Sequence, residues 1–318
     1  MITILHNARK NMGDFLIRER GLRLLPAGAV LNAWEPLTRE NINFANQCDS
    51  IVILGGPLLQ PRFYPELVRL TDDLDRIKAP IVLFGVGAWT YPPELETYKF
   101  SDQCRKLLDK VSAIGTRDDL SRRLLSDNGY SSLTIGCPAL QDSKGTGKRI
   151  QEPEEVQNVC ISPPADNKYR PQAAQLVAMV REMFPTASLH FSFNRGFWSG
   201  ADMRPYQQAG VCYNGSFKTE LDIYDKCDLH IGYRVHSHLW FLARRKPSYL
   251  LHEDGRGQGQ TELLVTEGVD AWDGFALHDL RDTIEWDLEN NYGSLEHVPG
   301  IIDELGEITE EFIAEEVL

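Results

Sequence analysis

The chain carries, near its C-terminal third, the stretch Asp228-Leu229-His230-Ile231-Gly232-Tyr233-Arg234-Val235-His236-Ser237-His238. Its first residues are mainly apolar and typical of a buried β-strand, and the glycine marks the end of that strand. The following residues present an arginine and two histidines at a loop. Because α/β proteins place ligand chemistry at strand ends of this kind, we expect a binding site here.

Short apolar runs alternate with helix-like stretches on both sides of this segment. Predicted strands cover residues 2–5, 50–54, 81–84, 113–114, 159–162, 188–191 and 248–251. Predicted helices cover residues 65–77, 102–111, 173–183 and 238–245. This alternation predicts βαβ units and mostly parallel sheets. The polar segment 142–148 interrupts the pattern, so we expect two α/β domains that meet there, with a ligand cleft between them.

Composition limits the class of protein. A length of 318 residues suits two domains, and 42% apolar residues suits a folded globular chain. A formal charge of −13 argues against a large nucleic-acid or anionic-membrane footprint. There is no apolar run of the roughly 18 residues that a membrane helix needs and no signal-peptide pattern, so we expect a cytoplasmic protein. The six cysteines lack metal or disulfide spacing, which favours reduced thiols.

Several segments together resemble the polysaccharide pyruvyl transferases. Each motif is short, but their order and spacing across residues 11 to 260 are specific. The segments are Asn11 to Asp14, Asp49 to Gly56, Leu83 to Gly87, Gly115 to Ser121, Gly136 to Ala139 and Asp228 to His236.

The resemblance implies two Rossmann-like domains in a GT-B-like arrangement. It also implies that pyruvate is transferred from phosphoenolpyruvate onto two hydroxyls of a sugar, forming a cyclic ketal and releasing phosphate. We expect residues 1–146 to form the acceptor side and residues 147–318 the donor side, with a helical C-terminal tail. Phosphoenolpyruvate is then the donor substrate, and neither a cofactor nor a metal is implied.

Phosphoenolpyruvate carries a phosphate and a carboxylate close together, so its site needs cations and backbone donors. A guanidinium matches either anion bidentately, which makes Arg234 the leading candidate. The resemblance implies that Arg234, Val235 and His236 contact the donor, with Val235 acting through its backbone. It also implies a donor-site role for Arg117, although pairing with the neighbouring aspartates is an alternative. Arg234 and His236 could likewise pair only with acidic neighbours, namely Asp225 or Asp228.

Ketal formation requires a proton on the methylene carbon of the donor and a partner for the leaving phosphate. His236 suits either role, and the sequence leaves both open. The family usually has a lysine where this chain has Arg256, twenty residues beyond His236 in a glycine-rich segment interpreted as an anion-cradling loop. Arginine keeps the charge but does not release a proton, so Arg256 is predicted to clamp phosphate.

Other candidates face the acceptor. Asn11 is predicted to bind substrate, and Asp14 is either a helix cap or a base that activates an acceptor hydroxyl. Trp89, in the run 89–91, and the pair 197–198 could stack on a sugar ring or belong to the core. His230 and His238 are expected to face the core or solvent.

Partners follow from the same resemblance. We expect a saccharide acceptor in a polysaccharide or its lipid-linked precursor, which would bring the protein to the inner membrane face peripherally, and no nucleic acid. Two other functions fit the architecture. One is a GT-B glycosyltransferase that uses a nucleotide sugar, and the other is a non-catalytic glycan-binding relative.

Overall fold

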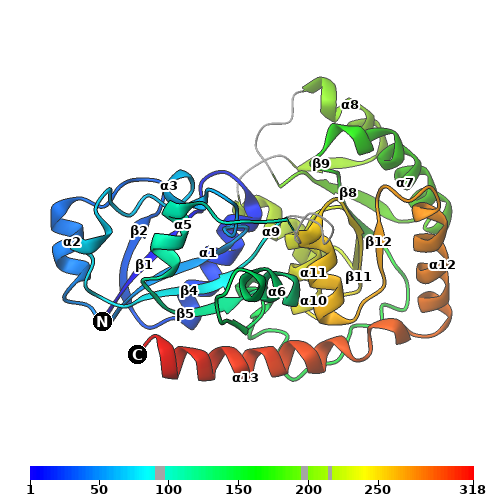
Figure 1. Ribbon diagram of the computed structural model, residues 1–318. Coiled ribbons are helices and arrows are strands. Elements are labelled where there is room, and N and C mark those ends of the chain that lie inside the picture. The colour runs from blue at the N-terminus through cyan, green and yellow to red at the C-terminus, as the bar shows by residue number, and fades with distance from the viewer. Residues whose placement is uncertain (90–96, 195–199, 214–216) are drawn as a thin grey trace. The chain divides into compact units, whose positions relative to one another are not determined.

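A computed structural model describes residues 1–89, 97–194, 200–213 and 217–318 of the chain (Figure 1). These residues divide into two compact units. Unit 1 comprises Met1–Arg9, Ile17–Gln141 and Glu304–Leu318, and unit 2 comprises Lys10–Leu16 and Asp142–Asp303. Each unit is an α/β structure built around a parallel sheet, as the alternating strand and helix signals predict.

The described part of unit 1 contains a six-stranded sheet in the order β2-β1-β3-β4-β5-β6. All neighbouring strands are parallel. The two central strands, β3 and β4, are buried along their whole length, which explains their near-continuous apolar sequence. The strands are β1 (Ile2–His6), β2 (Gly28–Asn32), β3 (Ser50–Gly56), β4 (Ile81–Val86), β5 (Val111–Thr116) and β6 (Leu133–Thr134).

Short helices connect these strands. Side chains of the expected kind cap two of them, Ser101 before α5 and Asp118 before α6. The helices of this part of the chain are α1 (Met12–Leu24), α2 (Arg39–Ala45), α3 (Phe63–Glu66), α5 (Asp102–Leu108) and α6 (Asp119–Asp127), with 3₁₀ turns η1 (Leu74–Arg76) and η2 (Pro138–Leu140).

The predicted helix over residues 65–77 is wrong. The structure has only the four-residue α3 and the turn η1 near this segment. Pro65 disfavours a helical conformation at the preceding residue, and Tyr64 is extended, with φ −114° and ψ 129°. Beyond it, backbone bonds run to another segment: Arg69 N–H donates to the Ala33 carbonyl, and Leu37 N–H donates to the Leu70 carbonyl. These long-range bonds replace the helical ladder.

The described part of unit 2 contains a second six-stranded parallel sheet, in the order β12-β11-β10-β7-β8-β9. The chain enters this sheet at β7, which pairs with β8 on one side and β10 on the other. The direction of winding therefore reverses between β7 and β10. The strands are β7 (Asn158–Ser162), β8 (Ser188–Ser192), β9 (Val211–Tyr213), β10 (Leu229–Gly232), β11 (Ser248–His252) and β12 (Gly268–Asp270).

Helices alternate with these strands and end in the long C-terminal helix. They are α7 (Arg170–Met183), α8 (Gly200–Ala209), α9 (Phe217–Lys226), α10 (Val235–Ala243), α11 (Gly255–Leu264), α12 (Ala276–Glu289) and α13 (Val298–Glu316), with 3₁₀ turns η3 (Asn167–Tyr169) and η4 (Gly293–Leu295). Among the helices of the described residues, none is both long and apolar enough to cross a membrane.

Two segments of unit 2 differ from the prediction at the places that matter for a site. Residues 234–236 were expected in a loop, but Arg234 is the N-cap of α10 and His236 lies in its first turn. The glycine-rich segment was also expected to be a loop, but α11 begins at Gly255. The Asp254 side chain caps α11 by accepting the Arg256 N–H, so the glycines that follow are helical.

The division into units differs from a single boundary at residue 146 because two segments cross it. Residues 10–16 belong to unit 2, where Met12 N–H donates to the Asn194 carbonyl over 2.9 Å. Residues 304–318, which comprise most of α13 and the two residues after it, belong to unit 1, where the Thr309 hydroxyl donates to the Ile135 carbonyl over 2.8 Å. The tail therefore completes the first unit rather than extending the second.

The end of α13 should contribute measurably to the stability of unit 1. Phe312 is buried, and its ring centroid lies 6.1 Å from that of Phe84 on β4. We expect Phe312→Ala to lower the free energy of unfolding by about 3–5 kcal/mol, because it leaves a cavity beside the sheet. Urea unfolding followed by circular dichroism measures this. The exposed neighbour Glu311, changed to alanine, is the control; equal stability of both variants would contradict the assignment.

Candidate functional site

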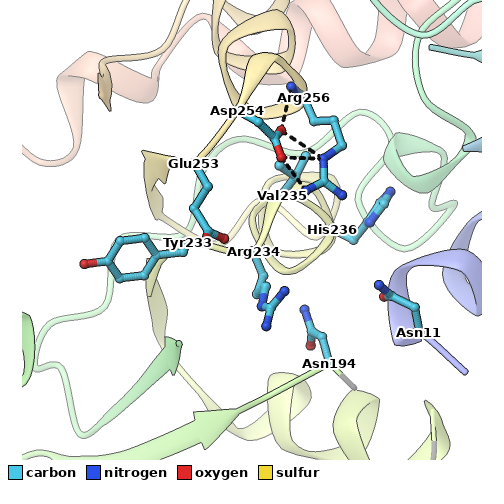
Figure 2. A pocket seen from close by; sticks show the side chains of 9 residues that line it. All are labelled: Asn11, Asn194, Tyr233, Arg234, Val235, His236, Glu253, Asp254 and Arg256. Atoms are coloured by element: carbon cyan, nitrogen blue, oxygen red, sulfur yellow. Dashed lines mark hydrogen bonds and ion pairs between the residues drawn. The ribbon is translucent and has the colours of Figure 1, made fainter. Parts of the chain in front are cut away.

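A pocket lies at the carboxyl ends of the strands of unit 2 (Figure 2). Its walls come from the segments that follow β8, β10 and β11, together with the start of α1. The reversal between β7 and β10 creates a crevice at this edge of a doubly wound sheet, which is where such sheets bind ligands. The lining residues are Asn11, Asn194, Tyr233, Arg234, Val235, His236, Glu253, Asp254 and Arg256.

Arg234 is held by the segment after β7. Its backbone N–H donates to the Ser162 hydroxyl over 3.0 Å. Its guanidinium donates from Nε to the Pro163 carbonyl over 2.8 Å and from Nη2 to the Pro164 carbonyl over 3.2 Å. Arg234 is only 8% exposed, so these bonds fix its orientation within the wall of the pocket. Carbonyl partners orient a guanidinium without cancelling its charge, which suits it to an anionic ligand.

The aspartates suggested as simple ion-pair partners are engaged elsewhere. One oxygen of Asp228 accepts the backbone N–H groups of Gln157 and Asn158, each over 2.8 Å. Asp225 pairs with Arg244 at 3.0 Å. Neither aspartate lines the pocket. The structure therefore does not support the alternative in which Arg234 and His236 only form ion pairs with these two aspartates.

His236 packs against the start of α1. A methyl group built at Gly13 would lie 2.0 Å from His236 Nδ1, so the backbone of α1 approaches the ring more closely than any side chain allows. The Asn11 side chain accepts the Gly13 N–H over 2.9 Å and caps this turn. Asn11 also lines the pocket. Asp14, in the first turn of α1, does not line it.

Arg256 enters the pocket as half of an ion pair. Its Nε lies 2.9 and 3.0 Å from the two oxygens of Asp254, and Figure 2 shows the two side chains facing each other. Burial alone would lower the pKa of Arg256, but the bond to Asp254 and the charges of Asp254, Glu253 and Asp14 raise it. A phosphate bound by Arg256 would therefore share the guanidinium with Asp254.

Four lining residues were not among the candidates predicted from sequence: Asn194, Tyr233, Glu253 and Asp254. All four follow predicted strands closely, so the strand-end rule that selected Arg234 could have found them. Asn194 also has a left-handed backbone, with φ +59°, which is uncommon outside glycine. Its side chain is buried and bonded to Ser192, Tyr224 and Ser237 over 2.8–2.9 Å. This network offsets the backbone strain and fixes the end of β8.

Two predicted site residues lie in unit 1 and do not line this pocket. Arg117 is 1% exposed, with Nε 3.0 Å from Asp118 Oδ2, and it also donates to the Ala88 carbonyl. The pairing with an aspartate is therefore present, but it is buried rather than on the surface. Trp89 is 47% exposed. The other aromatic candidates, residues 91, 197 and 198, and Thr90 lie outside the described residues.

His230 and His238 are core residues. Both are buried, and each places Nδ1 2.8 Å from the Ser248 hydroxyl. Burial, with a smaller effect of His252, lowers the pKa of His238 to about 3, so this ring is neutral at pH 7. Among the histidines of the quoted stretch, His236 alone lines the pocket.

Three solved structures illustrate the similarity of the fold. MnaA of S. aureus, solved with UDP, has a TM-score of 0.63 and 9% identity, covering 100% of this chain and 96% of that one. The UDP-GlcNAc 2-epimerase of Neisseria meningitidis, bound to UDP-GlcNAc, has a TM-score of 0.58 and 11% identity, covering 99% and 100%. A putative UDP-N-acetylglucosamine 2-epimerase of Listeria monocytogenes has a TM-score of 0.60 and 10% identity, covering 98% and 94%.

These similarities identify the GT-B fold alone, since the identities are so low. No curated protein matches the sequence. The family model described as polysaccharide pyruvyl transferase, in contrast, matches residues 5–252, which run from the end of β1 in unit 1 to the end of β11 in unit 2. The chain therefore belongs to the polysaccharide pyruvyl transferase family.

Proposed function

We propose that this protein transfers pyruvate from phosphoenolpyruvate onto two hydroxyls of a saccharide, forming a cyclic ketal and releasing phosphate. The observation that carries the proposal is the pocket of unit 2, where Arg234, His236 and Arg256 converge at the switch of the sheet. A small ligand with two anionic groups matches the two guanidinium groups of this set better than a neutral ligand would.

The backbone adds to the attraction for anions. Helices α10 and α11 both begin at the pocket, at Val235 and Gly255, so their partial positive charges face it. Val235 contributes through this backbone, as the family resemblance implies. In the proposal Arg234 binds one anionic group of the donor bidentately, and Arg256 binds the other while it keeps Asp254 as a partner.

The reaction needs a proton at the methylene carbon of the donor and removal of protons from two hydroxyls. His236 faces the pocket from the first turn of α10, where it can contact the phosphate or supply a proton. Asn11 is proposed to contact substrate, because it lines the pocket. Asp14 lines no part of this pocket, so the proposal assigns it no step. The acceptor is proposed to be a saccharide of a polysaccharide or of its precursor.

A nucleotide-sugar reaction is the second candidate, because MnaA was solved with UDP and the Neisseria meningitidis epimerase with UDP-GlcNAc, and both share the fold. The two candidates predict different ligands for the same pocket. Phosphoenolpyruvate should bind through the cations alone, whereas a nucleotide sugar also needs a surface for its base and ribose.

The first test is the reaction itself. Incubation with phosphoenolpyruvate and a panel of saccharides should release inorganic phosphate and give a sugar product with one added pyruvyl ketal, detected by mass spectrometry. Binding of phosphoenolpyruvate should be seen by calorimetry even without an acceptor. Binding of UDP-GlcNAc together with no binding of phosphoenolpyruvate would overturn the proposal in favour of nucleotide-sugar chemistry.

The planar guanidinium geometry of Arg234, and not only its charge, should contribute to the binding of phosphoenolpyruvate. Arg234→Lys keeps a cation but cannot bond to the donor bidentately while it holds the Pro163 and Pro164 carbonyls. We expect the Kd for phosphoenolpyruvate to rise about 10-fold to 100-fold, as for the loss of a hydrogen bond to a charged group. Calorimetry measures the Kd. Arg281→Lys, on the surface of α12, is the matched control and should leave the Kd unchanged.

The contact between Gly13 and His236 gives a second variant. Gly13→Ala places a methyl group against His236 Nδ1, so the ring or the start of α1 must move. We expect kcat to fall about 10-fold to 100-fold, because small misplacements at a reacting centre cost factors of this size. Phosphate release measures it.

The same methyl group should be harmless once the ring is absent. In a His236→Ala background, Gly13→Ala is expected to cause no further loss, as a double-mutant cycle would show. Gly300→Ala on α13, where no atom lies within 4 Å of the added group, is the control. Additive losses in the double variant would mean that Gly13 acts independently of His236.

A further inference from the structure

Glu253 is an acidic side chain in a pocket proposed to bind a donor with several negative charges. It follows β11 directly, and in Figure 2 its carboxylate points toward Arg234. A second carboxylate in the pocket, Asp254, is paired with Arg256. Among the described residues Glu253 forms no ion pair of this kind, so its presence in an anion site requires a physical reason.

The carboxylate of Glu253 is held in place by backbone. Its Oε2 accepts the Ala165 N–H over 2.9 Å, and its Oε1 accepts the Asp166 N–H over 2.8 Å. The same segment supplies the carbonyls that hold Arg234. Residues 163–166 therefore fix the cation and the carboxylate together, each facing the pocket. Each carboxyl oxygen has a second lone pair, so one can carry a proton while it accepts an N–H.

The surroundings of this carboxyl group have opposing effects on its pKa. Burial raises the pKa of Glu253, while the charge of Arg234, the two backbone bonds and the charge of Arg256 oppose the rise. An anion that binds beside it adds repulsion, and a like charge raises a carboxyl pKa further. The other titratable and charged groups around it are Asp14, Asp166, Tyr169, Tyr233, His236 and Asp254.

We propose that Glu253 takes up a proton when the donor binds and then delivers this proton to the methylene carbon of phosphoenolpyruvate. This inference rests on the proposed function and assigns the acid of that reaction. Protonation uses the electron pair of the carbon–carbon double bond to form the new C–H bond, and C2 becomes electrophilic. The two acceptor oxygens add to C2, and the C2–O bond to phosphate breaks.

The protons balance over the cycle. One acceptor hydroxyl returns a proton to the Glu253 carboxylate, and the other hydroxyl proton leaves with the phosphate. Asp254 is unsuited to the acid role, because both of its carboxylate oxygens already bond to the Arg256 guanidinium and one of them also caps α11. With Glu253 as the acid, the proposal assigns His236 the other of its two roles, that of partner of the departing phosphate.

Proton uptake on donor binding tests the inference without an acceptor. Phosphoenolpyruvate is titrated by calorimetry at pH 7 into the wild type and into Glu253→Gln, each in buffers of different ionisation enthalpy. We expect Glu253→Gln to take up fewer protons per donor bound than the wild type, with a difference of up to about one proton. Its affinity should be equal or higher and less dependent on pH, whereas wild-type affinity rises as the pH falls through the pKa of Glu253.

Turnover provides the second measurement. With an acceptor on which the wild type releases phosphate, kcat of Glu253→Gln should fall about 100-fold or more, as for the loss of a general acid, while the Kd for the donor is not weakened. Glu253→Asp keeps a titratable group but is one methylene shorter, so it should retain proton uptake and lose turnover. Glu262→Gln, an exposed carboxyl on the same α11, is the control.

The outcomes separate the two proposals. If the wild type binds phosphoenolpyruvate but Glu253→Gln takes up as many protons and turns over normally, the acid assignment is wrong and the donor assignment stands. If the wild type does not bind phosphoenolpyruvate, the proposed function fails, and this inference fails with it. Should Glu253→Gln not fold, as judged by circular dichroism, Glu253→Asp decides: normal turnover in that variant would overturn the acid role.

Discussion

The pocket depends on the close approach of two neighbouring strands at their carboxyl ends. Gly232, the last residue of β10, has φ +153°, and a methyl group built on it would lie 2.5 Å from the carbonyl oxygen of Ser162 on β7. Only glycine allows this approach. It places the Ser162 hydroxyl where it accepts the N–H of Arg234 over 3.0 Å and meets His230 Nε2 at 2.7 Å. The direction of Arg234 and the start of α10 follow from this contact.

The charged side chains of the pocket differ in the kind of partner that holds each of them. Arg256 pairs with Asp254, whereas Arg234 donates to the carbonyls of Pro163 and Pro164. Glu253 is held differently: its carboxylate accepts two backbone N–H groups, and the charges of Arg234 and Arg256 also act on it. A titratable carboxyl lets the net charge of the pocket change during the reaction.

The sequence was sufficient to predict the class of fold and the centre of the pocket, since both depend on local patterns. The strand before Gly232 and the Arg-x-His that follows are readable because apolar strand and polar strand end are adjacent in the chain. The side chains of Glu253 and Asn194 are held by hydrogen bonds to residues far away in sequence, Glu253 by Ala165 and Asn194 by Ser237. The assignment of residues 10–16 to unit 2 depends in the same way on a bond between Met12 and Asn194, which no local pattern announces.

The exchange of the usual family lysine for Arg256 gains a physical interpretation from Glu253. A lysine at this position, near Arg234 and His236, could lose its proton at neutral pH, but a guanidinium stays charged throughout. In this chain Asp254 holds the guanidinium by two bonds and the pKa of Arg256 is raised, so this position cannot exchange protons with substrate. The pocket nevertheless retains a group that can, because burial raises the pKa of Glu253, three residues before Arg256. In the proposed reaction, proton transfer and phosphate binding, which one lysine could combine, are divided between Glu253, which precedes α11, and Arg256 in its first turn.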